Sequence, residues 1–208
     1  MQPINRVAIL GLGALGAFYA SRFLDNTDCV VVAVADGDRK RAIEQDGFIL
    51  NGVPYAIPTV APDEPADPAD LIIVALKHHH LPEAGDYLKH LVCPHTTILS
   101  VMNGLDSEAY LGKRYGAEKV LYTVSVGIDA VRAQNRVTYT NPGKLFVGEA
   151  VNAVPPSSRV RRVQAALARA QIACETPSDM RRVMWWKSKS KVCSRWPRKR
   201  SCRRTRSK

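Results

Sequence analysis

The stretch Arg6-Val-Ala-Ile-Leu-Gly-Leu-Gly-Ala-Leu-Gly16 decides the fold. Its apolar run is typical of a short buried strand, and Gly11, Gly13 and Gly16 then form a GxGxxG pattern before a helical stretch that reaches about Leu24. The first glycine permits a tight turn, the second lets a pyrophosphate approach the backbone, and the third lets the helix pack on the sheet. The helix also begins with free N–H groups, which attract phosphates. We therefore expect a dinucleotide site at Gly11, Leu12, Gly13, Ala14, Leu15 and Gly16.

A second strand supports this interpretation. Cys29–Ala35 is rich in valine and ends at Asp36, twenty residues beyond Gly16. An acid at this place binds the ribose 2′-hydroxyl and favours NAD, whereas the guanidinium of Arg39 can bind a 2′-phosphate and favours NADP. These residues leave both forms of the cofactor open.

Along the rest of the chain, apolar strands alternate with helical stretches, as in βαβ units. Further strands are expected at Leu71–Leu76, Thr96–Val101 and Val120–Val126, and helices at 38–46, 82–91, 106–114, 159–170 and from about Ser178. Other expected features are a hairpin at Phe48–Ile57, a surface loop at Thr59–Pro68, and two strands, Arg136–Tyr139 and Leu145–Val147, that pair antiparallel across a turn. We therefore expect an α/β protein with a Rossmann-type, doubly wound, mostly parallel sheet and only the start of a C-terminal helical domain.

Positive charge is concentrated at the C-terminal end. The chain has 30 Lys and Arg against 19 Asp and Glu, and 11 of the basic residues lie from Lys187 to Lys208, where no acid occurs. The remaining 19 basic residues balance the acids, so residues 1–186 are neutral overall. The basic segment lacks apolar periodicity and cannot bury enough surface to offset its chain entropy. We expect an NAD(P)-binding domain at 1–176, the start of a helical catalytic domain at 177–187 and a disordered basic tail at 188–208.

The composition argues against several other classes of protein. No stretch approaches the ~20 apolar residues of a membrane span, and no signal segment precedes the glycine turn, so we expect a cytoplasmic protein without a membrane partner. The five cysteines lack CxxC spacing and indicate reduced thiols. His78, His79 and His80 are adjacent, whereas helical metal ligands are three or four residues apart. We interpret them as a polar loop near the cofactor and expect no metal.

Three more segments complete a resemblance to a known family. Val74-Ala-Leu-Lys77 ends a strand with a lysine, Met102-Asn-Gly-Leu-Asp106 places Asn103 after the next strand, and Met184-Trp-Trp-Lys187 places a lysine on the last helix. With the glycine turn, their order and spacing over residues 4–187 resemble the ketopantoate reductase (2-dehydropantoate 2-reductase) family. The resemblance implies NADPH as cofactor, a small anionic 2-keto acid as substrate, and reduction of ketopantoate to pantoate in pantothenate synthesis.

The resemblance also implies roles for single residues. Lys187 would be the general acid that protonates the alkoxide, and it would contact the substrate carboxylate. Asn103 would position the nicotinamide ribose and the substrate, and Lys77 would lie beside the cofactor. From the residues alone, other interpretations stay open. Lys77 can be a solvent-facing strand end, Asn103 part of a turn, and Lys187 the first residue of the basic tail.

The match breaks after Lys187. The family carries asparagines on the following turns of this helix, the first of them four residues on, where this chain has Lys191 and then Arg195. Neither side chain accepts a hydrogen bond. The family's helical domain, which closes the cleft and forms the dimer, has no counterpart in the tail. We therefore expect a truncated catalytic half, a poorly covered last helix, an impaired dimer, weak to moderate cofactor binding and low or absent turnover.

The origin of the tail and the exact activity stay open. A shifted reading frame, which we favour because the break falls inside a helix that the family needs, would give such an unbalanced run of Lys, Arg and Ser. Alternatively, the tail is a basic arm that binds nucleic acid through phosphate contacts, although we do not expect nucleic acid as a partner. A third hypothesis is a dehydrogenase of another 2-keto acid that shares the cofactor half.

Overall fold

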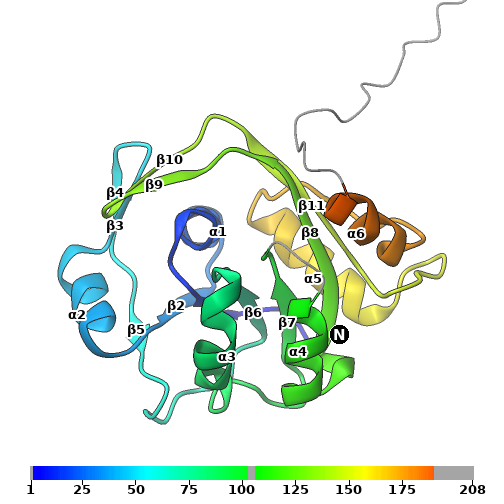
Figure 1. Ribbon diagram of the computed structural model, residues 1–208, viewed down its shortest axis with the longest axis horizontal. Helices are drawn as coiled ribbons and strands as arrows, with labels where there is room; N and C mark the ends of the chain where they lie inside the picture. The colour runs from blue at the N-terminus through cyan, green and yellow to red at the C-terminus, as the bar shows by residue number, and fades with distance from the viewer. Residues whose placement is uncertain (1, 103–105, 190–208) are drawn as a thin grey trace, which may run out of the picture.

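A central sheet of eight strands organises the structure, a computed structural model that describes residues 2–102 and 106–189 (Figure 1). Its strands are β1 (Arg6–Leu10), β2 (Val30–Val34), β5 (Thr59–Val60), β6 (Leu71–Val74), β7 (Thr97–Ser100), β8 (Val120–Ile128), β11 (Pro142–Gly148) and β12 (Cys174–Glu175). They lie in the order β12-β11-β8-β7-β6-β1-β2-β5. The strands from β8 to β5 are parallel, and β11 runs antiparallel to β8. The expected α/β fold with a doubly wound, mostly parallel sheet is confirmed.

Helices cover both faces of this sheet. The α-helices that pack on it or flank it are α1 (Ala14–Asn26), α2 (Gly37–Asp46), α3 (Leu81–Ala84), α4 (Asp106–Tyr115) and α5 (Ser158–Arg169), and the short 3-10 helices are η1 (His78–His80), η2 (Gly85–Leu88) and η3 (Ala117–Lys119). In β1, Val7 and Ile9 are buried in the core beneath α1 and α5. Ala8 and Leu10 are buried in the second core, beneath α3 and α4. Because both faces of β1 are covered, its residues 7–10 are continuously apolar instead of alternating.

A two-stranded ribbon leaves the sheet between β8 and β11 and passes over α1 (Figure 1). It consists of β9 (Val131–Ala133) and β10 (Arg136–Thr138), which pair antiparallel. β10 also pairs parallel with β3 (Phe48–Leu50), the neighbour of β4 (Val53–Tyr55), so that a second sheet has the order β4-β3-β10-β9. The ribbon therefore connects two distant parts of the chain above α1.

This pairing corrects one expectation. The strand at 136–138 does not pair with the strand at 142–148; β10 pairs with β9 and β3, and β11 pairs with β8. The carboxylate of Asp129 accepts hydrogen bonds from the backbone N–H groups of Thr140 and Asn141, at 2.8 and 2.9 Å. These bonds hold the chain beside the end of β8, and the next strand, β11, therefore pairs antiparallel with β8.

Three further segments can be compared with the predictions from the sequence. Asn51 and Gly52 have φ of 47° and 88°, as a type I′ turn requires, and they join β3 to β4 in the predicted hairpin. Thr59 and Val60 do not belong to a loop, because they pair with β2 as the edge strand β5. The helix expected at 82–91 is divided into the shorter α3 and η2.

The last helix, α6 (Met180–Lys189), packs on β8 and β11. Met180 and Met184 are buried against Val124 and Phe146. The expectation of a poorly covered helix is therefore wrong for this face. Trp185, on the same helix, is 58% exposed.

The C-terminal boundary also differs from the expected one. The helix α6 continues through Ser188 and Lys189, which the charge pattern assigns to the tail. The rest of the expected tail, residues 190–208, lies outside the described residues. In the part of the chain that is described, no helix is both long enough and apolar enough to cross a membrane.

Candidate cofactor-binding cleft

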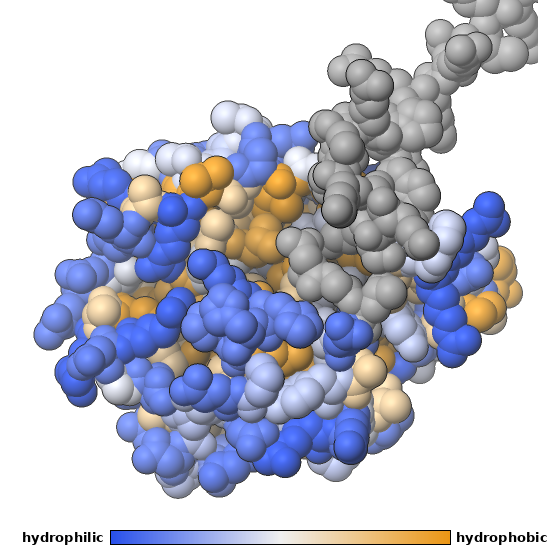
Figure 2. Space-filling model, viewed as in Figure 1, coloured by the Kyte–Doolittle hydropathy of each residue, from blue (hydrophilic) through white to orange (hydrophobic). Residues whose placement is uncertain are grey.

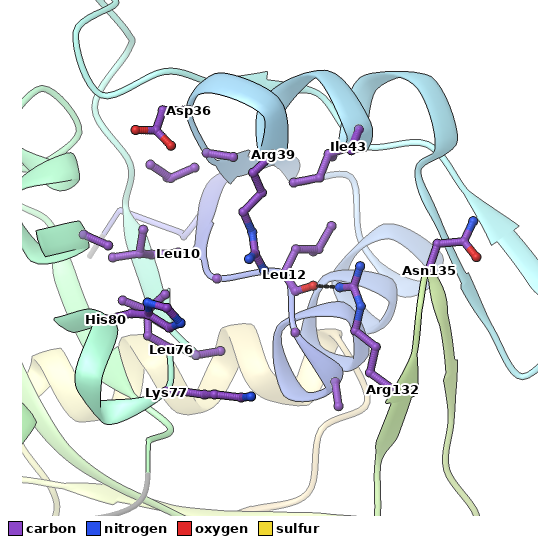
Figure 3. Close-up of a pocket in the computed structure, with 18 of the residues that line it drawn as sticks. Leu10, Leu12, Asp36, Arg39, Ile43, Leu76, Lys77, His80, Arg132 and Asn135 are labelled. Atoms are coloured by element: carbon purple, nitrogen blue, oxygen red, sulfur yellow. Dashed lines mark hydrogen bonds between the residues drawn. The ribbon is translucent and has the colours of Figure 1, made fainter.

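A cleft opens at the carboxyl ends of β1, β2 and β6 (Figure 3). Within the sheet, β2 is the neighbour of β1 on one side and β6 is its neighbour on the other side. The order of the strands therefore reverses at β1, and such a switch point is where doubly wound sheets bind ligands. The cleft has a volume of about 1100 Å³, which is at the large end of the range for ligand sites. In Figure 2, hydrophobic side chains show between hydrophilic ones across the middle of the molecule. The cleft is therefore large and combines apolar walls with polar groups.

The glycine turn is closely packed at two of its three glycines. Gly11 has φ of +93°, and a Cβ there would lie 2.9 Å from the carbonyl oxygen of Ala75. A Cβ on Gly16 would overlap the carbonyl oxygen of Gly11. At Gly13, by contrast, the nearest atom to a Cβ would be the Ala75 oxygen at 3.9 Å, an ordinary contact. Packing within the protein explains why positions 11 and 16 require glycine, but it does not explain the glycine at position 13. The open side of Gly13 suits the close approach of a phosphate.

The N-terminus of α1 has the features of an anion site. Gly13 is its N-cap residue, no side chain caps the helix, and no acid lies in its first turn. The first N–H groups of a helix have no acceptor within the helix, and the helix dipole favours negative charge beside them. Together with the open side of Gly13, this arrangement fits the diphosphate of a dinucleotide.

Asp36 lies on another wall of the cleft, after β2 (Figure 3). It is the N-cap residue of α2, and its Oδ2 accepts a 2.7 Å hydrogen bond from the hydroxyl of Tyr87 in η2. This bond is the main cause that raises the pKa of Tyr87 to about 12, because a phenolate would face a carboxylate. The Tyr87 hydroxyl thus donates to the Asp36 carboxylate and holds it in place.

The cleft brings together most of the residues that the sequence predicts as cofactor ligands. Those that line it are Gly11, Leu12, Gly13, Ala14, Asp36, Arg39 and Lys77. Leu15 and Gly16 do not line it, and Gly16 is buried within α1 against Gly11. Asn103 and the side chain of Lys187 lie outside the described residues. The roles of these two residues therefore stay predictions.

Several cleft residues escaped the sequence analysis. They are Tyr87, Arg132, Gln134 and Asn135. His80 also lines the cleft, in agreement with the expectation that the three histidines lie near the cofactor. Arg132 and Asn135 reach the cleft because the ribbon pairs with β3, and no pattern in the local sequence predicts that pairing.

The three adjacent histidines do not gather around one point. His78 Nε2 lies 3.5 Å from Asp106 Oδ2, whereas the rings of His79 and His80 contact each other at a centroid distance of 4.1 Å. Among residues 2–102 and 106–189, no three His, Cys, Asp or Glu side chains are grouped so that they could hold a metal ion. Of the three histidines only His80 lines the cleft.

Comparison with known proteins identifies the family. The model of the family described as ketopantoate reductase PanE/ApbA matches residues 7–152. A 2-dehydropantoate 2-reductase of Streptococcus pyogenes serotype M1 is 25% identical over 142 residues, which cover 67% of this chain and 46% of that protein. One of Mesorhizobium japonicum is 23% identical over 206 residues, with coverages of 88% and 63%.

Solved structures agree with the fold. The 2-dehydropantoate 2-reductase of Geobacter metallireducens is 28% identical, with a TM-score of 0.72, over 88% of this chain and 61% of that one. D-mandelate dehydrogenase with NADH and anilino(oxo)acetate shares the fold at 18% identity, with a TM-score of 0.74, over 88% of this chain and 60% of that one. This chain thus spans about half to two thirds of the length of these proteins. Because the family model matches most of its residues, the chain belongs to the ketopantoate reductase PanE/ApbA family.

Proposed function

We propose that this protein binds NADPH in the cleft at β1 and reduces 2-dehydropantoate to pantoate, a step of pantothenate synthesis. The observation that carries the proposal is the uncapped N-terminus of α1 beside the open face of Gly13, at the switch point of the sheet. Family membership supplies the substrate and the reaction. The cytoplasm remains the expected compartment.

The described residues suggest how the cofactor would be held. The backbone of Gly13 and Ala14 would bind the diphosphate. Asp36 would lie beside the adenosine ribose, and the Arg39 guanidinium would bind the 2′-phosphate of NADPH. Lys77 follows β6 at the same edge of the sheet and is exposed in the cleft, where its ammonium group can contact the cofactor. When bound, the nicotinamide would supply a hydride to the carbonyl carbon of the substrate.

The chain's own residues would complete the reaction. The carbonyl oxygen gains negative charge as its carbon accepts the hydride, and the Lys187 ammonium would donate the proton that converts the alkoxide to a hydroxyl. Its positive charge would also attract the substrate carboxylate. Asn103 would orient the nicotinamide ribose and the substrate toward each other.

A binding titration and a turnover assay test this function. The 208-residue chain is titrated with NADPH and with NADH while the fluorescence of the reduced nicotinamide is followed, and oxidation is then recorded with ketopantoate and a panel of other 2-keto acids. We expect saturable binding and a preference for ketopantoate. Preference for another 2-keto acid would support the hypothesis that the protein is a dehydrogenase of that acid. The absence of dinucleotide binding would overturn the proposal.

A further inference from the structure

Arg132 approaches the glycine turn from the underside of the ribbon. In the antiparallel pair of β9 and β10, Arg132 lies opposite Val137, and Ala133 lies opposite Arg136. Residues that lie opposite each other point to the same face of such a pair, and Val137 is only 1% exposed, in the core that includes α1. Arg132 therefore points to the inner face of the ribbon, whereas Arg136 points to the outer face.

Two carbonyl groups hold the Arg132 guanidinium in the cleft. Its Nε donates a 2.6 Å hydrogen bond to the carbonyl oxygen of Gln134, and its Nη1 donates to the carbonyl oxygen of Leu12, the residue between Gly11 and Gly13 (Figure 3). A guanidinium has five N–H donors, so most of its donors are not used by these two contacts. The group is thus fixed beside the turn and can still bind a ligand.

The ribbon itself is firmly attached. The backbone N–H of Ile49 donates a 2.9 Å hydrogen bond to the carbonyl of Asn135, and that of Asn51 donates a 2.9 Å bond to the carbonyl of Val137. These bonds tie β10 to β3 on either side of the paired residues. Arg132 is therefore presented by a paired element and not by a free loop.

Arg132 and Arg39 bring positive charge to the same part of the cleft. Neither guanidinium forms an ion pair with a carboxylate in the described residues. The pKa of Arg132 is lowered, first because burial removes solvent and then because the positive charge of Arg39 lies nearby. Two neighbouring cations repel each other, and an anion bound between them would remove that repulsion.

We propose that Arg132 is a ligand of the cofactor's diphosphate, supplied from the ribbon and acting opposite the N-terminus of α1. The inference rests on the proposed function. The diphosphate is favoured over a 2′-phosphate because Arg132 contacts Leu12 in the glycine turn, whereas Asp36, where the adenosine ribose is expected, lies across the cleft (Figure 3). On binding, a phosphate oxygen would accept hydrogen bonds from the guanidinium, a geometry that arginine provides in pairs.

Binding of four ligands by three forms of the full chain tests this assignment. The forms are the parent, Arg132→Gln, and Arg136→Gln as the matched control on the outer face of the ribbon; the ligands are NADPH, NADH, ADP-ribose and AMP. We expect Arg132→Gln to raise the Kd of NADPH, NADH and ADP-ribose by a similar factor of about tenfold or more, because charge-assisted hydrogen bonds are lost. AMP, which has no diphosphate, should be affected less, and Arg136→Gln should bind all four like the parent.

The outcomes separate the two proposals. If the parent binds no dinucleotide, the proposed function fails, and this inference fails with it. If the parent binds and Arg132→Gln binds equally well, only the role of Arg132 is refuted. Weakening confined to NADPH would also refute it, because it would place Arg132 at the 2′-phosphate. Thermal unfolding of both variants shows whether a loss of binding comes from a loss of folded protein.

Discussion

The hydroxyl of Tyr87 donates a 2.7 Å hydrogen bond to Oδ2 of Asp36 and thereby joins η2 to the end of β2. The two residues come from different βα connections, on either side of β1 in the sheet. An exposed carboxylate at a strand end would ordinarily sample several rotamers. Here the phenol restricts it, and the cleft receives a negative charge at a defined place.

Replacing Asp36 with Asn removes this charge but keeps a hydrogen-bonding partner for Tyr87. We expect the ratio of Kd values for NADPH and NADH to shift toward NADPH by about tenfold, since a carboxylate binds a ribose 2′-hydroxyl and repels a 2′-phosphate. Fluorescence titration of both cofactors measures the ratio. The control is Asp38→Asn, which removes an exposed acid of the same helix that pairs with Arg41 and does not line the cleft. An unchanged ratio in Asp36→Asn would show that the ribose does not lie beside Asp36.

The glycine turn predicts opposite outcomes for two alanine substitutions. Gly16→Ala places a Cβ on the Gly11 carbonyl oxygen and should reduce the free energy of unfolding by about 3 kcal/mol. Gly13→Ala meets nothing closer than 3.9 Å and should stay within about 1 kcal/mol of the parent. Because its methyl group would occupy the approach of a phosphate, Gly13→Ala should nevertheless weaken NADPH binding by about tenfold. Denaturant unfolding and NADPH titration measure the two quantities, and normal NADPH binding by Gly13→Ala would argue against a phosphate at this turn.

These features show what the sequence alone could predict. The glycine turn, the strands beside it and the Asn51-Gly52 hairpin depend on residues close together in the chain, and their patterns are strong. The pairing of β10 with β3 joins Arg136 to Ile49, and no local pattern encodes a parallel contact between strands so far apart in sequence. Arg132 was missed for that reason, because its orientation follows from the ribbon.

Cys174 offers a test at high pH. Burial raises the pKa of its thiol to about 11, and only the thiolate is alkylated at an appreciable rate. An unperturbed thiol has a pKa of about 8.5. At that pH, Cys174 of the folded protein should react about 100-fold more slowly than Cys174 of the urea-unfolded chain. Its rate should then rise with pH up to about 11. Iodoacetamide labelling with peptide mass spectrometry follows this residue separately from the other cysteines. Equal rates in folded and unfolded protein would contradict the partial burial of the Cys174 thiol.

The departure from the family after Lys187 predicts slow catalysis by the 208-residue chain. The resemblance implies asparagines at the positions where this chain has Lys191 and Arg195, and neither a lysine nor an arginine side chain can accept a hydrogen bond from a substrate hydroxyl. We expect ketopantoate-dependent oxidation of NADPH at less than about one turnover per second, the lower end for ordinary enzymes. NADPH titration of the same preparation provides the control, because it counts the binding-competent molecules and separates slow chemistry from unfolded protein. Turnover at ordinary enzyme rates would show that Lys191 and Arg195 do not prevent the reaction, and would contradict this prediction.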